Sequence, residues 1–158
     1  MNEPIDIQNS SRDQTARELN TLLADYAIYN QRLRNYHWNV KGKRFFQLHE
    51  EFEKLYAQSS EWSDVIAERV ARLHGRPAST LREFLELSRL EEDPSAGRPD
   101  STMMVRRLVD DIDKLNAFAA TTVKTAGESG DVATSTLLED IVKVQEENAW
   151  MLSSWLAE

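Results

Sequence analysis

Cysteine is absent from this chain of 158 residues. Disulfides and thiolate metal sites are therefore excluded, and a transition metal would need imidazole and carboxylate ligands, which suit iron, manganese and zinc. Only five glycines and four prolines interrupt the long periodic segments, and this scarcity favours helices over strands. Only three histidines are present, so the position of each one is informative.

Long apolar runs and basic tails are also missing. No uninterrupted apolar run reaches the roughly 18 residues of a membrane span, and MNEPIDIQNS at the start shows no charged-then-apolar signal pattern. We therefore expect a cytoplasmic protein without membrane contact. The net charge of −8 argues against a general nucleic-acid binder, because neutralising phosphates requires a basic surface. An acidic surface suits a protein that attracts cations.

Apolar residues recur every three or four positions in four long segments, which predicts four amphipathic helices. The predicted helices span about residues 13–40, 45–74, 100–127 and 131–158. A short amphipathic piece at about 80–87 lies in the long connection between the second and third helices. Residues 1–12 are polar and aperiodic, and we expect them to form a flexible arm. Residues 13–158 are then a single all-α domain.

The second predicted helix ends in His74-Gly75-Arg76-Pro77, which is typical of a helix stop with glycine at the C-cap. His74 is expected to be a cation facing the helix dipole rather than a metal ligand. Gly42 is expected to end the first helix in a similar way.

Four polar residues of the second predicted helix share one strip of its surface, and they are His49, Glu53, Asp64 and Glu68. At about 100° per residue they fall within roughly one quadrant of the helix. One imidazole and three carboxylates on one strip are candidate metal ligands; the alternative is an ordinary solvated helix face. The metal interpretation is favoured by aromatic neighbours, which seldom line a solvated face: Trp38, Phe45, Phe46, Phe52 and Trp62.

The strip is too long for one metal ion. Glu53 and Asp64 are eleven residues apart, which is roughly 16 Å along a helix, whereas metal–ligand distances are about 2.0–2.3 Å. Either each pair finds other partners, or a second chain supplies the missing half. Antiparallel packing of two copies about a two-fold axis near residues 58 and 59 would join His49 and Glu53 to Asp64 and Glu68 of the partner subunit. The small residues of Ala57-Gln58-Ser59-Ser60 would allow close approach.

The segments YHWNVKG, LHEEFE and WSDVIAERV resemble the Dps family of mini-ferritins, and the similarity extends from about residue 15 to residue 155. The resemblance implies a ferritin-like four-helix bundle with a short helix in the long crossover, assembled from two-fold dimers into a hollow dodecamer. It implies a ferroxidase site between subunits, with His37 and His49 from one chain and Asp64 and Glu68 from the neighbour. Glu53 stands where the family places an acidic residue that assists the site.

The resemblance also implies an activity. Fe(II) would be oxidised, with hydrogen peroxide preferred over oxygen, and stored as ferric mineral, which would protect against oxidative stress; zinc or manganese could substitute for iron. Trp38 matches an aromatic residue that the family keeps beside the iron. Trp38 and Trp62 could quench radicals, with packing as the alternative role.

The resemblance further implies acidic three-fold pores built from the turn before the last helix. Glu128 and Asp131 are the candidate pore acids, with Glu139 as a further one. Asp131 could instead be the N-cap of the fourth predicted helix. Arg69, directly after Glu68, is expected to form an ion pair that orients the metal site.

The sequence bears on three rival functions. Many Dps relatives bind DNA through a Lys/Arg-rich tail, but the arm here has Arg12 as its only cation, and Lys41, Lys43 and Arg44 form only a small patch. We therefore expect weak or no DNA binding, and keep a nucleoid-associated DNA-compacting shell as the alternative. A purely structural bundle is the second rival. The third, a di-iron site inside one subunit, requires Glu-x-x-His motifs, and no histidine here has Glu three residues before it.

Overall fold

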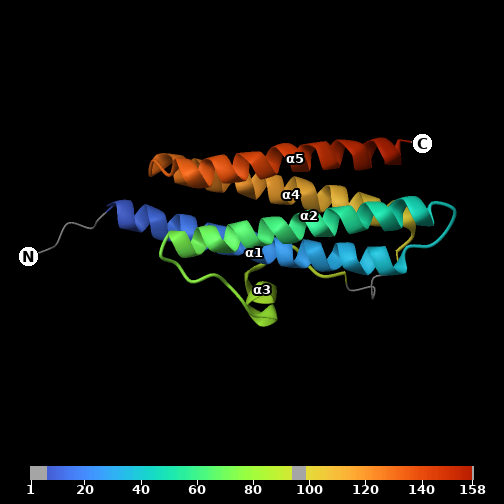
Figure 1. Ribbon diagram of the computed structural model, residues 1–158, viewed down its shortest axis with the longest axis horizontal. Coiled ribbons are helices and arrows are strands. Elements are labelled where there is room, and N and C mark those ends of the chain that lie inside the picture. Colours follow the sequence, from blue (N-terminus) through green and yellow to red (C-terminus); the bar gives the residue numbers. More distant parts are fainter. Residues whose placement is uncertain (1–6, 94–98, 158) are drawn as a thin grey trace, which may run out of the picture.

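The computed structural model describes residues 7–93 and 99–157, and this part of the chain contains helices and no strand. The helices are α1 (Ile7–Asn39), α2 (Phe45–Arg72), α3 (Leu81–Leu87), α4 (Ser101–Glu128) and α5 (Val132–Leu156). α1 pairs with α2, α4 pairs with α5, and α1 also contacts α4 (Figure 1). The expected all-α four-helix fold with a short helix in the crossover is confirmed. No helix in these two ranges is long and apolar enough to cross a membrane.

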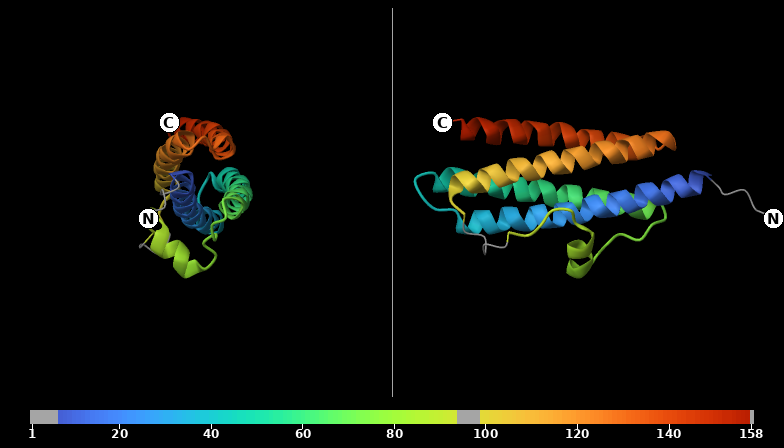
Figure 2. Two further views of the ribbon diagram at one scale, coloured as in Figure 1. Left: turned by 90° about the vertical axis from the view of Figure 1, so that its left-hand side faces the viewer. Right: turned by 180° about the vertical axis from the view of Figure 1, so that it is seen from behind.

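The short helix α3 lies outside the bundle, against α1 (Figure 2). Its start is defined by a capping box: the Glu83 backbone N–H donates to the Thr80 hydroxyl, and the Thr80 N–H donates to the Glu83 carboxylate. Hydrogen bonds from Arg76 and from the Ser79 and Thr80 backbone lower the pKa of Glu83 to about 2. These hydrogen bonds therefore anchor the part of the crossover around α3, which has no fully buried residue.

Two helix ends differ from the sequence prediction. α1 begins at Ile7, so residues 7–12 of the predicted arm are helical, while residues 1–6 lie outside the described part. Apolar periodicity reports packing only, and a helix can extend beyond the core that it packs against. The sequence also predicts a loop at residues 91–97, which contain proline, glycine and serine, and the structure describes this segment only up to residue 93.

The second difference is the C-terminus of α2. His74, not Gly75, adopts the left-handed conformation, with φ of 64°. The Gly75 N–H donates to the Val70 carbonyl and the His74 N–H to the Ala71 carbonyl, the pattern of a Schellman motif. The prediction of Gly75 as the cap was therefore wrong. Gly75 serves a close approach instead, because a Cβ there would lie 3.0 Å from Val70 Cγ1 and 3.2 Å from Ala16 Cβ.

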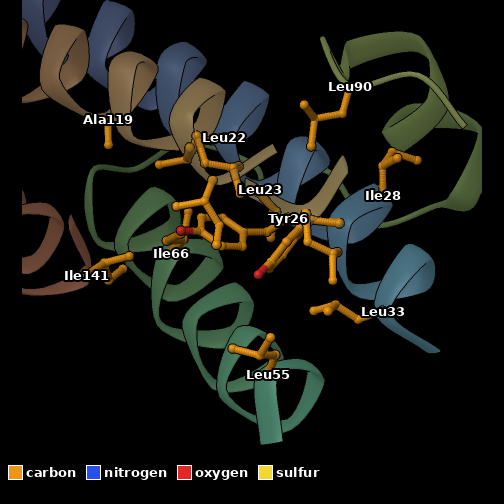
Figure 3. Packing of buried hydrophobic residues seen from close by; sticks show 14 of the residues in the cluster. Leu22, Leu23, Tyr26, Ile28, Leu33, Leu55, Ile66, Leu90, Ala119 and Ile141 are labelled. Atoms are coloured by element: carbon orange, nitrogen blue, oxygen red, sulfur yellow. The ribbon is translucent and has the colours of Figure 1, made fainter. Parts of the chain in front are cut away.

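The core fixes α1 against α2 and thereby positions the end of the hairpin. Tyr26 and Tyr29 of α1 are almost completely buried, as are Leu33 and Tyr36. Figure 3 shows Tyr26 among Leu22, Leu23, Leu33, Leu55 and Ile66, with Ile141 and Ala119 contributed by α5 and α4. Each such side chain contributes roughly 1.5–3 kcal/mol when it leaves water. The α1–α2 pairing is therefore a rigid support.

A buried ion pair ties α1 to α4. Arg32 contacts Asp111, and the two side chains are only 10% and 4% exposed. Arg32 also donates to the backbone carbonyl of Glu91, while Arg89 pairs with the fully buried Asp25. The last part of the crossover is therefore held to α1 through buried charges.

Replacing Arg32 with methionine is expected to lower the free energy of unfolding by about 3–5 kcal/mol, the typical cost of leaving one buried charge unpaired. Burial raises the pKa of Asp111 to about 6 even with Arg32 beside it. Urea unfolding would measure the loss. The double variant Arg32→Met/Asp111→Leu should recover part of it, and a single variant as stable as wild type would refute the buried pair.

Candidate metal centre

Two histidines meet where α1 ends and α2 begins. The rings of His37 and His49 are stacked, with centroids 3.7 Å apart and 15° between their planes. His37 Nδ1 lies 2.7 Å from the His49 carbonyl oxygen, and His49 Nδ1 lies 2.7 Å from the His37 carbonyl oxygen. A carbonyl can only accept, so each Nδ1–H donates, and each Nε2 keeps its lone pair. This is how metal-binding histidines are usually oriented.

The local fold explains this reciprocal arrangement. Gly42, with φ of 109°, allows a tight turn between the two helices, and the Phe45 N–H donates to the Gly42 carbonyl at 3.1 Å. The carbonyl of His37 belongs to the last turn of α1, where carbonyls lack helical donors. The imidazole of His49 satisfies it. One hydrogen bond therefore both satisfies a carbonyl in the last turn of α1 and orients the ring of His49.

Aromatic rings enclose the histidine pair on both sides. Phe45 stacks on His49 with centroids 4.9 Å apart, and Tyr56 meets His37 edge-on at 5.3 Å. The Arg34 guanidinium lies 4.3 Å from the centre of the Tyr56 ring. The sequence pattern alone did not single out Tyr56 as a contact of His37. Its position two helical turns after His49 was the available signal.

The candidate acidic ligands lie elsewhere on α2. Glu53, Asp64 and Glu68 are all exposed, and Glu68 makes only a long ion pair of 3.8 Å with Arg72. Asp64 is fifteen residues beyond His49, or roughly 22 Å along the helix. Within residues 7–93 and 99–157, no three His, Asp or Glu side chains of one chain converge as a metal site would require. One chain thus brings the two histidines together and leaves the acids apart.

The bundle interior carries polar groups of another kind. Asn148 donates to the side-chain oxygens of Gln58 and Gln145, and Gln145 donates to the Tyr26 hydroxyl at 3.4 Å. The buried carboxylate Asp111 is paired with Arg32. These interior groups are amides, a phenol and an arginine-paired carboxylate, whereas a di-iron site within one subunit is built from a cluster of carboxylates and histidines.

Arg69 does not orient the acidic residues of α2. It contacts Asp131 at 2.7 Å and donates to the Thr134 hydroxyl at 2.8 Å, so it joins α2 to the start of α5. The expected ion pair beside Glu68 was wrong, because position 69 faces the bundle while Glu68 faces solvent. Asp131 is the N-cap of α5 and accepts from the Thr134 N–H. The pore roles of Glu128 and Asp131 stay predictions.

Trp38 and Trp62 have different surroundings. Trp62 packs edge-on against the buried Tyr26 with centroids 5.8 Å apart, so its packing role is present. Trp38, which follows His37, is 63% exposed, and Phe46 at the start of α2 is 83% exposed. Large apolar groups so open to water often mark a surface that another molecule covers.

Comparison with known proteins agrees with the helical fold described above. The Ferritin-like domain family matches residues 16–158. DNA protection during starvation protein 2 of Bacillus anthracis is 37% identical over 90% of this chain and 97% of its own length. A Dps protein from Bacillus brevis has a crystal structure with a TM-score of 0.90 at 35% identity, covering 93% of this chain and 97% of that one.

A Dps protein from Vibrio cholerae O1 has a structure with a TM-score of 0.88 at 34% identity, covering 94% of this chain and 92% of that one. It is described as a member of a broad superfamily of ferritin-like diiron-carboxylate proteins. The matches cover nearly the whole chain, and they agree with its helical fold. The chain therefore belongs to the Dps family of the ferritin-like superfamily.

Proposed function

We propose that this protein is a ferroxidase and iron-storage mini-ferritin, whose Fe(II) substrate binds between two-fold-related subunits. The observation that carries the proposal is the stacked histidine pair, with both Nδ1 atoms engaged and both Nε2 atoms available. The diiron-carboxylate description of the Vibrio cholerae relative supports iron as the metal. Among the described residues of one chain, no acidic side chain joins the two histidines in a metal-binding group, so the proposal requires a second subunit.

The exposed face of α2 is suited to such pairing. Glu53, Ala57, Ser60, Asp64 and Glu68 form one exposed stripe along the helix, with the two smallest side chains at its centre. Asn30 donates to the hydroxyls of Ser59 and Ser60, which holds this segment close to α1. An antiparallel copy packed about a two-fold axis at this centre would bring each acidic end to the other chain's histidine end. Two equivalent sites would result.

The chemistry follows from the ligand types. Nε2 of His37 and His49 would donate to Fe(II), while Asp64 and Glu68 of the partner subunit, with Glu53 nearby, would supply the negative charge that favours the Fe(III) product. Hydrogen peroxide would take one electron from each of a pair of Fe(II) ions and, with two protons, leave as water. Zinc or manganese could occupy the same ligands.

We extend the proposal to a hollow dodecamer that stores ferric mineral and protects against oxidative stress. Glu128 and Asp131 lie at the turn between α4 and α5, where acidic pores could admit Fe(II). Of the two, Glu128 is exposed, whereas the carboxylate of Asp131 is only 10% exposed and contacts Arg69. Glu128 is therefore the stronger pore candidate.

The name of the Bacillus anthracis relative supports a second candidate function, a DNA-compacting shell with little ferroxidase role. Lys41 and Lys43 are exposed in the turn between α1 and α2, which is the basic patch available for it. A gel-shift assay at physiological salt separates the two functions, because a shell that works through DNA must bind under these conditions. We expect weak or no binding there.

Anaerobic loading with Fe(II), followed by hydrogen peroxide, tests the proposed activity. We expect oxidation much faster than in buffer, soluble iron cores visible by electron microscopy, and a particle of dodecameric mass. Oxidation at the buffer rate, with iron precipitating outside the protein, would refute the ferroxidase and storage roles together. The particle mass would then show whether the subunits still assemble into a shell.

A further inference from the structure

A polar pocket lies at the opposite end of the bundle from the histidine pair. It has a volume of about 460 Å³ and is formed where α2 ends, beside the turn between α4 and α5. Figure 1 shows these two segments together with the N-terminal part of α1 at one end of the molecule. Its charged lining consists of Arg12, Arg69, Arg72, His74 and Asp131.

The pocket is cationic in an acidic chain. The described lining contains three arginines and one carboxylate, and Glu68 lies beside Arg72, which leaves one positive charge in excess, whereas the chain as a whole carries −8. Arg72 has only a long contact of 3.8 Å with Glu68, and both side chains are exposed. Arg12 forms no ion pair with any residue of the described ranges. At least two of the guanidinium groups can therefore turn to a ligand.

The helix ends around the pocket reinforce this charge. The first residues of α5, Val132 and Ala133, line it, so the positive end of a helix dipole lies there. α2 contributes its negative end, but the carbonyls of Val70 and Ala71 already accept hydrogen bonds from Gly75 and His74. The arrangement therefore favours an anion inside the pocket, while the exposed Glu128, the pore candidate, is not part of its lining.

We propose that this pocket is a binding site for a tetrahedral oxyanion, with inorganic phosphate as the ligand. Guanidinium groups bind the oxygens of a phosphate in pairs of parallel hydrogen bonds. Arg12 and Arg72 bind the anion directly. Arg69, held by Asp131 and Thr134, supplies a fixed charge at the base of the site.

Equilibrium dialysis with radiolabelled phosphate tests this site on the iron-free assembled protein, with chloride adjusted to keep ionic strength constant. Wild type should bind phosphate saturably, at about one per subunit because each chain carries one pocket. Arg12→Gln/Arg72→Gln should weaken binding at least about tenfold, since two charge-assisted contacts are lost. Arg82→Gln/Lys114→Gln removes two exposed cations from α3 and α4 and should bind like wild type.

A third variant tests the opposite direction. Asp131→Asn keeps a good N-cap residue but removes the acid of the described lining and releases Arg69, so phosphate should bind several-fold more tightly. Absence of saturable binding, equal loss in the control variant, or unchanged affinity in Asp131→Asn would overturn the site. Because no iron is present, these results are independent of the proposed ferroxidase.

Discussion

Fe(II) oxidation by the variant His37→Ala/His49→Ala is expected to be at least about 100-fold slower than by wild type, because the site loses both nitrogen ligands. The two residues act as a unit: each imidazole donates to the other's backbone carbonyl, and the rings stack at 3.7 Å. Removing one would also release the other. Stopped-flow absorbance after addition of hydrogen peroxide would measure the initial rate.

The third histidine provides a matched control for this prediction. His74 is exposed just beyond the C-terminus of α2, far along that helix from His49, and His74→Ala should oxidise Fe(II) at the wild-type rate. Circular dichroism and particle mass would verify that the double variant still folds and assembles. If the double variant assembles and still oxidises Fe(II) at the wild-type rate, the two histidines are not part of the site.

The variant Asp64→Asn/Glu68→Gln is expected to lose activity to a similar extent, at least about 100-fold. The reason is different, because these carboxylates are exposed in one chain and contribute little to its fold. The variant should therefore lose activity while the stability of its subunit stays unchanged. The control Asp110→Asn/Asp113→Asn removes two exposed carboxylates from α4 and should keep full activity.

If Asp64→Asn/Glu68→Gln oxidises Fe(II) at the wild-type rate, these two carboxylates are not part of the site. The proposed two-fold arrangement would then be wrong. Loss of activity in both variants alone does not show that the ligands come from different subunits. The arrangement of the ligands needs a measurement that separates the chains.

The main features of the fold could be predicted from the sequence because they depend on periodicity and on local capping. Apolar spacing indicated the long helices, and of the two roles that the sequence left open for Asp131, the structure contains the N-cap of α5. The start of α1 could not be predicted, because residues 7–12 form helix without an apolar stripe. Helical hydrogen bonds need no core, so the pattern carries no signal there.

The candidate site was predictable only in part. The strip from His49 to Glu68 follows from helical geometry, and the distance between its halves suggested a second chain. The stacking of His37 on His49 and the edge contact of Tyr56 depend on how α1 packs against α2, which residue spacing within one helix does not encode. Arg69 was misassigned for the same reason, since its partners Asp131 and Thr134 are more than sixty residues away.

Co-assembly of the two inactive variants tests the two-chain site most directly. A subunit lacking His37 and His49 still carries Asp64 and Glu68, and a subunit lacking the acids still carries the histidines. After unfolding and refolding as an equal mixture, half of the two-fold pairs should be mixed, each with one complete site, so activity should return to about one quarter of wild type. Activity that stays at the level of the separate variants would contradict a site shared between subunits.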